Sequence, residues 1–444
     1  MASGRRITAA PVGVAAGLAP PDLASLLSRM HIALSEKVWN EPSLRPSQEE
    51  AARRLADPSL PSNLLYIDKT GSGKTHVTRI VGVAEKGITL IIINLHSLSA
   101  DQMAKFAGAN QAYGTVEAHN VDEVFVKSKA KYNELLRRGR RLQRGTTSTV
   151  FLFCSPQFMC YHPDFLNMLL DATDRHVLRL VVLDEVHLHV QQGTSFRVEI
   201  RMLKKVFFEK VYSKSRVDRH PKTIFATATM AKGYVPMASN LTTIGFPPAA
   251  ILWAPPSAFE QRNIEMQFAC SDQYVKRLDR VVALVTDDDE GCVCVFVGSK
   301  DRSYHILAEL ERKLNEALQT VDVMHVHGSL DKNEKYWFIR FFCAGINIPE
   351  LRAKILLATA AANVGIDHHL VILVLNLGWT RDLCTYFQQR GRGGRVAEME
   401  CICIQMGSLQ SHVEIVFHTQ QELMPSWTMP PSHRMLLWSA STPQ

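Results

Sequence analysis

The stretch LLYIDKTGSGKT, residues 64–75, places an apolar run directly before a glycine-rich turn, and a helical segment follows it. This order of strand, loop and helix is typical of a P-loop, whose backbone N–H groups and helix N-terminus bind phosphates. In that interpretation Lys74 reaches the β- and γ-phosphates and the Thr75 hydroxyl ligates Mg²⁺. Asp68 stands where many P-loops have Gly or Ala, so on this stretch alone a turn that binds nothing is the alternative. The other predicted phosphate-binding residues are Thr70, Gly71, Ser72 and Gly73.

Short aliphatic runs alternate with helical segments on both sides of a proline-rich connector at residues 246–256. Continuous apolar runs bounded by turn residues are typical of strands buried on both faces of a parallel sheet. Those in the first half are Leu64–Ile67, Thr89–Asn94, Val150–Cys154, Leu180–Leu183 and Thr223–Phe225. Those in the second half are Val293–Val297, Val321–His325, Ile355–Ala358, Val371–Leu375 and Cys401–Gln405. We therefore predict an α/β protein of two units with mostly parallel sheets.

Composition suggests where these units begin and end. The first 20 residues are rich in Ala, Gly and Pro and predict a flexible tail, after which an amphipathic helix is expected to start near Asp22. The predicted segments are a tail at 1–20, a first domain at 21–246, a linker at 247–258, a second domain at 259–418 and a C-terminal tail at 419–444.

The apolar run Leu180–Leu183 leads directly into Asp184, Glu185, Val186 and His187. A buried strand that ends in two acids can place Asp184 to hold Mg²⁺ and Glu185 to polarise the attacking water. A pair of acids at a strand end is otherwise common as a helix N-cap or a solvated turn. Because a P-loop precedes this pair, we favour the catalytic interpretation, and we include His187 among the candidate catalytic residues.

The second half contains the stretch QQRGRGGR at residues 388–395. The planar guanidinium of arginine matches the charge that develops on a transferring phosphoryl group. We predict that Gln388, Arg392 and Arg395 complete the nucleotide site from the second domain. A disordered RGG-like nucleic-acid segment is the alternative, but this stretch lies between apolar segments and is not repeated. Three such parts in two domains predict an NTPase whose site closes when the domains meet.

The formal net charge is +7 and the isoelectric point is near 8.9, which suits a polyanionic partner and says nothing of the fold. Much of the excess lies between Lys127 and Arg144, where Glu134 is the single acid. This basic stretch predicts nucleic-acid contact, a nuclear-import signal or simply a solvated helix face. On this basis the nucleus is the expected location.

The chain has 9 cysteines and no secretory signal, which predicts a reducing compartment and free thiols. Cys292 with Cys294, and Cys401 with Cys403, stand two apart inside apolar runs, so each pair shares one face of a strand. We expect these thiols to pack in a core rather than to bind zinc. No apolar stretch is long enough to span a bilayer, and we expect no membrane partner.

Taken in order, these segments resemble those of superfamily 2 helicases, and their details are most similar to the RecQ family. LRPSQ at 44–48 resembles the RecQ motif 0, whose Arg and Gln recognise adenine, so Arg45 and Gln48 are expected to bind the base of ATP. FEQRNI at 259–264 is similar to the segment that enters the second RecQ domain. Further matches are CSPQF at 154–158, the aromatic-rich loop QGTSFR at 192–197, ATAT at 226–229, FVGS at 296–299, HGSL at 327–330 and ATAAANVGID at 358–367.

The resemblance implies two tandem RecA-like domains of the P-loop NTPase fold, with ATP and Mg²⁺ as cofactors. It implies an ATP-dependent 3′–5′ helicase acting on single-stranded DNA and duplex junctions, and it adds Gly365 and Asp367 to the nucleotide site. The expected nucleic-acid contacts are Ser155, Pro156, Phe196, Arg197, Ser299, His327 and Thr359. The tryptophan usual in the aromatic-rich loop is absent, which predicts weaker coupling. The zinc and winged-helix modules of RecQ enzymes have no counterpart here, so unwinding is less firmly implied than ATPase activity.

Two other functions fit the same residues. A truncated helicase remnant would bind nucleic acid without productive unwinding, although the intact Lys74, Asp184 and Glu185 favour an enzyme. An RNA helicase would have the same ATPase residues, because Asp-Glu-x-His motifs occur in RNA helicases too. The sequence does not indicate an oligomeric state.

Overall fold

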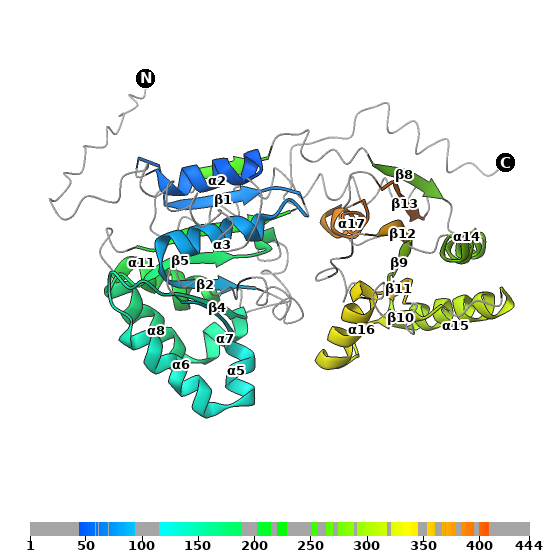
Figure 1. Cartoon of the computed structure of the whole chain (residues 1–444). Coiled ribbons are helices and arrows are strands. Elements are labelled where there is room, and N and C mark those ends of the chain that lie inside the picture. Colours follow the sequence, from blue (N-terminus) through cyan, green and yellow to red (C-terminus); the bar gives the residue numbers. More distant parts are fainter. Residues whose placement is uncertain are drawn as a thin grey trace, which may run out of the picture.

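The structure is a computed structural model of the whole chain, and the two α/β units stand beside each other in it (Figure 1). The residues that it describes are 44–57, 59–60, 62–69, 71–93, 106, 115–187, 202–214, 220–228, 250–254, 263–269, 274–287, 291–317, 321–344, 353–359, 366, 368, 370–378, 383–394 and 399–407.

The first sheet has seven strands in the order β3-β4-β2-β5-β6-β1-β7, and every neighbouring pair is parallel. Its strands are β1 (Asn63–Ile67), β2 (Gly87–Ile92), β3 (Val116–Asn120), β4 (Thr149–Cys154), β5 (Leu178–Leu183), β6 (Lys222–Thr227) and β7 (Ala250–Trp253). Parallel neighbours require crossover connections, which helices provide. The helices of this unit are α2 (Pro46–Ala56), α3 (Lys74–Glu85), α5 (Val121–Lys127), α6 (Lys129–Arg141), α7 (Pro156–Tyr161), α8 (Pro163–Asp174), the π-helical turn η3 (Lys204–Phe208) and α11 (Glu209–Lys214).

The second sheet has six strands in the order β10-β11-β9-β12-β13-β8, again all parallel. Its strands are β8 (Ile264–Ala269), β9 (Cys292–Val297), β10 (Val323–Val326), β11 (Ile355–Ala358), β12 (Val371–Leu377) and β13 (Cys401–Met406). Its helices are α14 (Tyr274–Asp287), α15 (Lys300–Glu316), α16 (Lys332–Ala344) and α17 (Leu383–Arg390). The predicted α/β class with mostly parallel sheets is confirmed.

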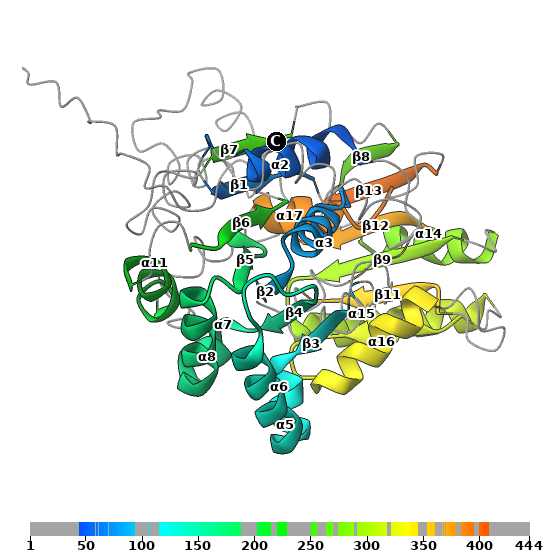
Figure 2. The ribbon, with the colours of Figure 1, turned by 60° about the vertical axis from the view of Figure 1, so that its left-hand side comes forward.

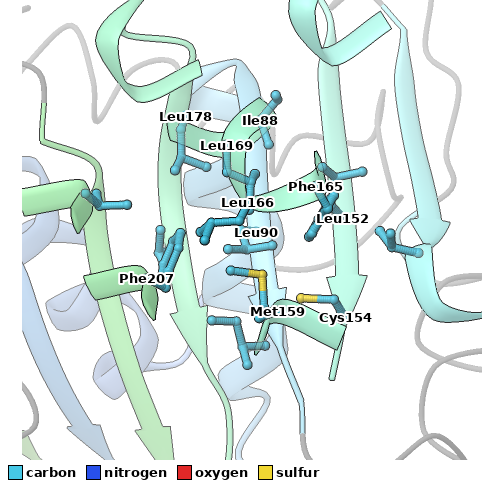
Figure 3. Packing of buried hydrophobic residues seen from close by; sticks show 14 of the residues in the cluster. Ile88, Leu90, Leu152, Cys154, Met159, Phe165, Leu166, Leu169, Leu178 and Phe207 are labelled. Carbon is cyan, nitrogen blue, oxygen red and sulfur yellow. The ribbon is translucent and has the colours of Figure 1, made fainter. Parts of the chain in front are cut away.

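Each sheet is buried on both faces, as the apolar runs predicted. In the first unit, alternate residues of β1 belong to different cores: Leu65 and Ile67 pack on one face and Leu64 and Tyr66 on the other. Figure 3 shows part of one core, where Leu90 of β2 and Leu152 of β4 meet α7 and α8. Two-sided burial leaves the strand ends as the place where polar side chains can gather.

The predicted core role of the paired cysteines is confirmed. Cys292 and Cys294 of β9 and Cys401 and Cys403 of β13 are all buried in a single core cluster on one face of the second sheet. Burial raises the pKa of the Cys401 and Cys403 thiols to about 12, which keeps both protonated at neutral pH. Within the described ranges, no helix has the length and apolar character needed to cross a membrane.

Three strands differ from the sequence prediction. β7 lies inside the stretch 247–258 that we predicted to be a linker, and it pairs with β1 through Leu64–Ile67. β3 was missed because Glu117 and His119 interrupt its apolar pattern; it is an edge strand, where polar residues are tolerated. β8 was also missed, and it pairs with β13 at the other sheet's edge. The helix expected near Asp22 lies outside the described residues.

Candidate nucleotide and nucleic-acid site

The two predicted catalytic segments of the first unit follow strands that have a single strand between them. The P-loop follows β1, the acidic segment follows β5, and β6 lies between these two strands in the sheet. Because carboxyl ends of parallel strands meet at one edge of a sheet, the fold brings these segments together. Thr227, the last residue of β6, contacts both of them: its carbonyl accepts from Asp68 N at 3.1 Å, and its hydroxyl lies 2.8 Å from His187 Nδ1.

The P-loop turns sharply into α3. Gly71 and Gly73 have φ angles of 77° and 81°, the left-handed region that glycine adopts at little cost. Gly73 is the N-cap of α3, so Lys74 and Thr75 occupy its first turn. Lys74 Nζ donates to the carbonyls of Asp68 at 2.8 Å and Lys69 at 2.9 Å. The lysine is thus held over the loop that should receive the phosphates.

Helix α2 is attached to the P-loop by the residues that were predicted to recognise adenine. Gln48 is buried, and its Nε2 donates to the carbonyls of Ser72 at 2.8 Å and Gly73 at 3.2 Å. Arg45 Nη1 donates to the Gly71 carbonyl at 3.1 Å. A Cβ on Gly73 would collide with Gln48 Nε2. The structure therefore unites both predicted parts of the nucleotide site.

Asp68 has a role that the sequence prediction did not assign. Its side chain is buried beneath the loop, where Oδ2 accepts from Ser47 Oγ at 2.7 Å and from the Tyr66 hydroxyl at 2.9 Å. Its Oδ1 accepts from Lys69 N at 2.8 Å. Ser47 belongs to α2, so this carboxylate ties the adenine segment to the phosphate loop. The departure from the usual Gly or Ala was the signal that could have identified it.

The acidic segment turns immediately after β5. Glu185 has a φ of 52°, a conformation that non-glycine residues rarely adopt and that is concentrated at functional sites. Asp184 Oδ1 accepts from Glu185 N at 2.9 Å. Glu185 Oε2 lies 3.2 Å from His187 Nδ1. The turn presents both carboxylates at the same sheet edge as Lys74.

The two carboxylates have different proton affinities. Burial and the charge of Glu185 raise the pKa of Asp184 to about 6. Burial also favours the neutral form of Glu185, but its hydrogen bond with His187 and the charges of Lys74 and Arg392 outweigh this and lower its pKa. Glu185 therefore stays ionised, as a base that orients water must be.

Residues of the second unit reach this site. Gln388, at the end of α17, lies with Nε2 2.8 Å from His187 Nε2. Arg392 is 7% exposed and donates from Nη1 to the Ile366 carbonyl at 2.8 Å, and its charge acts on Glu185. The structure thus joins the predicted catalytic residues of both units. Thr70, Gly365, Asp367 and Arg395 lie outside the described residues.

The donor set fits Mg²⁺ bound together with a nucleotide. A threonine hydroxyl and an aspartate carboxylate are oxygen ligands, and magnesium in nucleotide sites usually takes only one or two protein ligands besides phosphates and water. Thr75, in the first turn of α3, and Asp184 are the residues that would hold it. The lysine charge that acts on Asp184 comes from Lys74.

Two family models match the chain, one in each unit. Residues 45–235 match the DEAD/DEAH box helicase model and residues 274–397 match the helicase conserved C-terminal domain. The ATP-dependent DNA helicase RecQ of Bacillus subtilis is 23% identical over 368 residues, covering 81% of this chain and 53% of that protein. The Pasteurella multocida RecQ is 22% identical over 365 residues, covering 81% and 49%. This chain is a helicase core that joins a DEAD/DEAH box domain to a helicase C-terminal domain, and it is similar in sequence to RecQ helicases.

The helicase core spans about half the length of these curated relatives. Solved structures support the same fold. A structure of Saccharomyces cerevisiae Dbp5 bound to RNA and ADP BeF3 has a TM-score of 0.60 at 18% identity and covers 93% of both chains. The DUF1998 helicase MrfA bound to DNA and AMPPNP has a TM-score of 0.62 at 15% identity and covers 90% of this chain and 53% of that one. The predicted pair of RecA-like domains is confirmed.

The predicted nucleic-acid contacts of the helicase core also follow strands of the two sheets. Ser155 follows β4, near the β3 edge, and Ser299, His327 and Thr359 follow β9, β10 and β11. The nucleotide residues follow β1 and β5 in one sheet, and α17 follows β12 in the other. In the first sheet β2 lies between β4 and β5, whereas in the second sheet β9 and β12 are neighbours. Phe196 and Arg197 lie outside the described residues.

Several of these contacts are already engaged within the helicase core. Ser155 is 4% exposed; its hydroxyl donates to Asp122 at 2.6 Å and caps α7, whose first residue is Pro156. Ser299 caps α15. His327 Nε2 lies 2.9 Å from the hydroxyl of the exposed Tyr304. Thr359 donates its backbone N–H to the Val326 carbonyl at 3.0 Å. Because the N–H and the hydroxyl of Ser155 both donate to Asp122, Ser155 would have to rearrange to contact a nucleic acid.

Proposed function

We propose that this helicase core is an ATP-dependent 3′–5′ DNA helicase or translocase that moves on single-stranded DNA and separates duplexes. The observation that carries the proposal is the contact between Gln388 and His187, which joins the second unit to the acidic segment beside the P-loop. An ATPase site formed by residues of two units can convert the hydrolysis of ATP into a change in the relative position of these units.

The residues divide the chemistry among them. Arg45 and Gln48 receive the adenine, and Lys74 exchanges its loop carbonyls for phosphate oxygens. The ionised Glu185 orients the attacking water, and Arg392 stabilises negative charge on the transferring group. Mg²⁺ held by Thr75 and Asp184 supplies further charge neutralisation when it is bound.

The order of each sheet supports coupled movement along a strand. In the first sheet the nucleotide residues follow β1 and β5 and the predicted nucleic-acid residue Ser155 follows β4, and all three strands belong to one layer. A displacement of this layer at the nucleotide residues therefore displaces Ser155 as well. Contacts to phosphates from Ser299, His327 and Thr359 would be insensitive to base sequence and strongly dependent on salt.

DNA is the proposed substrate because the curated relatives are named as DNA helicases. The second candidate is an RNA helicase, and the likeness to Dbp5 bound to RNA favours it. Polarity follows from the resemblance to RecQ. Comparing ATPase stimulation by single-stranded DNA with that by RNA of the same sequence separates these candidates.

The deciding experiment measures steady-state ATP hydrolysis without nucleic acid, with single-stranded DNA and with RNA. We expect strong stimulation by DNA that is abolished in Glu185→Gln, because this variant keeps the shape of the side chain and loses the base. An ATP hydrolysis rate in Lys74→Ala equal to that of wild type would refute the assignment of these residues to an ATPase site. Absence of turnover with every nucleic acid would indicate a binding protein of helicase shape.

A further inference from the structure

Tyr304 is an exposed aromatic side chain that the proposed ATPase site does not use. It belongs to α15, and 46% of its surface is exposed, whereas the neighbouring Ser303 is buried. In Figures 1 and 2, α15 lies at the β10–β11 end of the second sheet, away from β8 and β13. The side chains around this ring indicate what it can bind.

The ring lies among the residues of the second unit that were predicted to contact nucleic acid. The Tyr304 hydroxyl is 2.9 Å from Nε2 of His327, which follows β10. Ser299 is the N-cap of the same helix, little more than one turn before Tyr304. Thr359 donates its backbone N–H to the carbonyl of Val326, the residue before His327. Since these contacts follow the carboxyl ends of β9, β10 and β11, Tyr304 stands at the same edge of the sheet as the predicted strand contacts.

His327 itself presents little surface, because it is only 4% exposed. Burial and the charges of Lys300 and Lys335 lower its pKa, so the imidazole is neutral at pH 7. A neutral imidazole has one acceptor nitrogen, and Nε2 can therefore accept the hydroxyl proton of Tyr304. In this arrangement the histidine orients the tyrosine, and the tyrosine provides the exposed surface.

Two further contacts hold this part of α15 against β10. Ser303 Oγ lies 2.8 Å from His325 Nε2, and the Tyr304 ring meets the His325 ring edge-on at 4.9 Å between centroids. Burial lowers the pKa of His325 to about 4, so this histidine is neutral as well. A side chain that is fixed before binding loses less conformational entropy when a partner stacks on it. The Tyr304 ring is thus held from the side of the sheet while much of its surface stays open.

Cations stand beside the exposed ring. Lys300 Nζ lies 5.9 Å from the centroid of the Tyr304 ring. Lys335, in the first turn of α16, donates to the Gly328 carbonyl at 2.9 Å. Single-strand sites combine aromatic rings, on which bases stack, with cations that pair with the backbone phosphates. Tyr304 and these two lysines supply both kinds of group.

We propose that Tyr304 stacks on a nucleobase of the single strand, with Lys300 paired to an adjacent phosphate and His327 positioning the tyrosine. This inference deepens the proposed function and rests on it, because it assumes that a single strand runs past the ends of β9, β10 and β11. Every base has an aromatic face, so the contact holds the strand without reading its sequence.

The test compares the binding of two probes by the full chain, a labelled oligothymidine strand and an abasic strand of the same length. Both strands carry the same phosphates, and only the first has bases. The measured quantity is the ratio of the dissociation constant for the abasic strand to that for the intact strand. Because a loss of folded protein changes both constants by the same factor, the ratio reports on contacts to the bases.

The variants are Tyr304→Ala, which removes the ring, and Tyr304→Phe, which keeps the ring and loses the hydroxyl. The matched control is Tyr274→Ala, which removes another exposed tyrosine from the start of α14, after the opposite edge strand β8. We expect Tyr304→Ala to lower the ratio about tenfold, which is within the range that stacking of one base on an aromatic ring gives. Tyr304→Phe should lower the ratio much less, and Tyr274→Ala should leave it unchanged.

The positioning role of His327 has its own test. His327→Leu and Tyr304→Phe break the same hydrogen bond, so each should lower the ratio by a similar small factor and the double variant should lower it no further. Losses that multiply in the double variant would overturn this role.

An unchanged ratio in Tyr304→Ala, or an equal fall in Tyr274→Ala, overturns the inference while leaving the proposed function intact. A loss of affinity for both strands at an unchanged ratio also overturns it, because Tyr304 would then contact the backbone or support the fold. If the wild type binds neither strand, the proposed function itself fails, and the inference fails with it.

Discussion

Gln388 and His187 come from different units, and their Nε2 atoms lie 2.8 Å apart. An amide nitrogen donates, so His187 accepts through Nε2 and carries its proton on Nδ1, which faces Thr227 and Glu185. The proton position of one histidine therefore links the second unit to the carboxylate that orients water. Through this contact, the position of the second unit can affect the protonation and orientation of His187 beside Glu185.

Gln388→Ala should lower the DNA-stimulated kcat about tenfold, which corresponds to about 1.4 kcal/mol, with little change in KM for ATP. His187→Ala should cost more, because it also removes the contacts to Thr227 and Glu185. The double variant should equal His187→Ala, since both substitutions break one contact. Steady-state ATPase assays measure this, with Gln267→Ala on β8, outside the candidate site, as control. Losses that multiply in the double variant would show that the two residues act separately.

Asp68→Asn should raise KM for ATP about fivefold with a smaller effect on kcat, because hydrogen bonds to a charged group contribute about 1.5–3 kcal/mol and only part of this reaches the nucleotide. The reason is the position of Ser47, between Arg45 and Gln48 on α2. Looser attachment of α2 should also reduce the preference for ATP over GTP. Tyr66→Phe removes one of the bonds to Asp68 and should show a weaker form of both effects. An unchanged ATP to GTP ratio in both variants would limit Asp68 to a structural role.

Gly73→Ala should lower ATPase activity more than Gly71→Ala does. Both glycines have positive φ, so a Cβ adds strain of about 1–2 kcal/mol at either position. They differ in their neighbours: a Cβ on Gly73 meets Gln48 Nε2, and a Cβ on Gly71 meets nothing within 4 Å. ATPase assays of both variants, together with fluorescence measurements of nucleotide binding, would check this. Equal losses in the two variants would mean that strain decides the outcome and the contact with α2 does not.

The sequence predicted the parts of the site that depend on local patterns. Apolar runs ending in a glycine-rich loop or in two acids identify strand ends, and the structure places Lys74, Glu185 and Arg392 in one region. The bonds from Asp68 to Ser47 and Tyr66 depend on how α2 packs, which no local pattern encodes. The same limit applies to β7, because a short strand after prolines is indistinguishable from a connector until its partner β1 is known.

Glu85 should make the stability of the first unit depend on pH. It is buried at the end of α3, where its carboxylate contacts Arg179 at 2.6 Å and Lys222 at 2.8 Å. Burial favours its neutral form, but the charges of Lys222 and Arg179 outweigh burial and lower its pKa below the ordinary value of 4.5. A lowered pKa in the folded state means that this stabilisation is complete above about pH 4.5 and is lost as the pH falls through the folded value.

Glu85→Gln should therefore lower the free energy of unfolding at pH 7 by about 1–3 kcal/mol, because it leaves two cations without their buried partner. The difference from wild type should shrink as the pH falls below 4.5, when Glu85 itself becomes protonated. Urea unfolding of wild type and Glu85→Gln, at pH 7 and at a pH below 4.5, measures this difference. Glu309→Gln, which disrupts the more exposed pair with Arg312 on α15, should leave the urea midpoint close to wild type. A difference between Glu85→Gln and wild type that is the same at both pH values would show that the charge of Glu85 does not stabilise the fold.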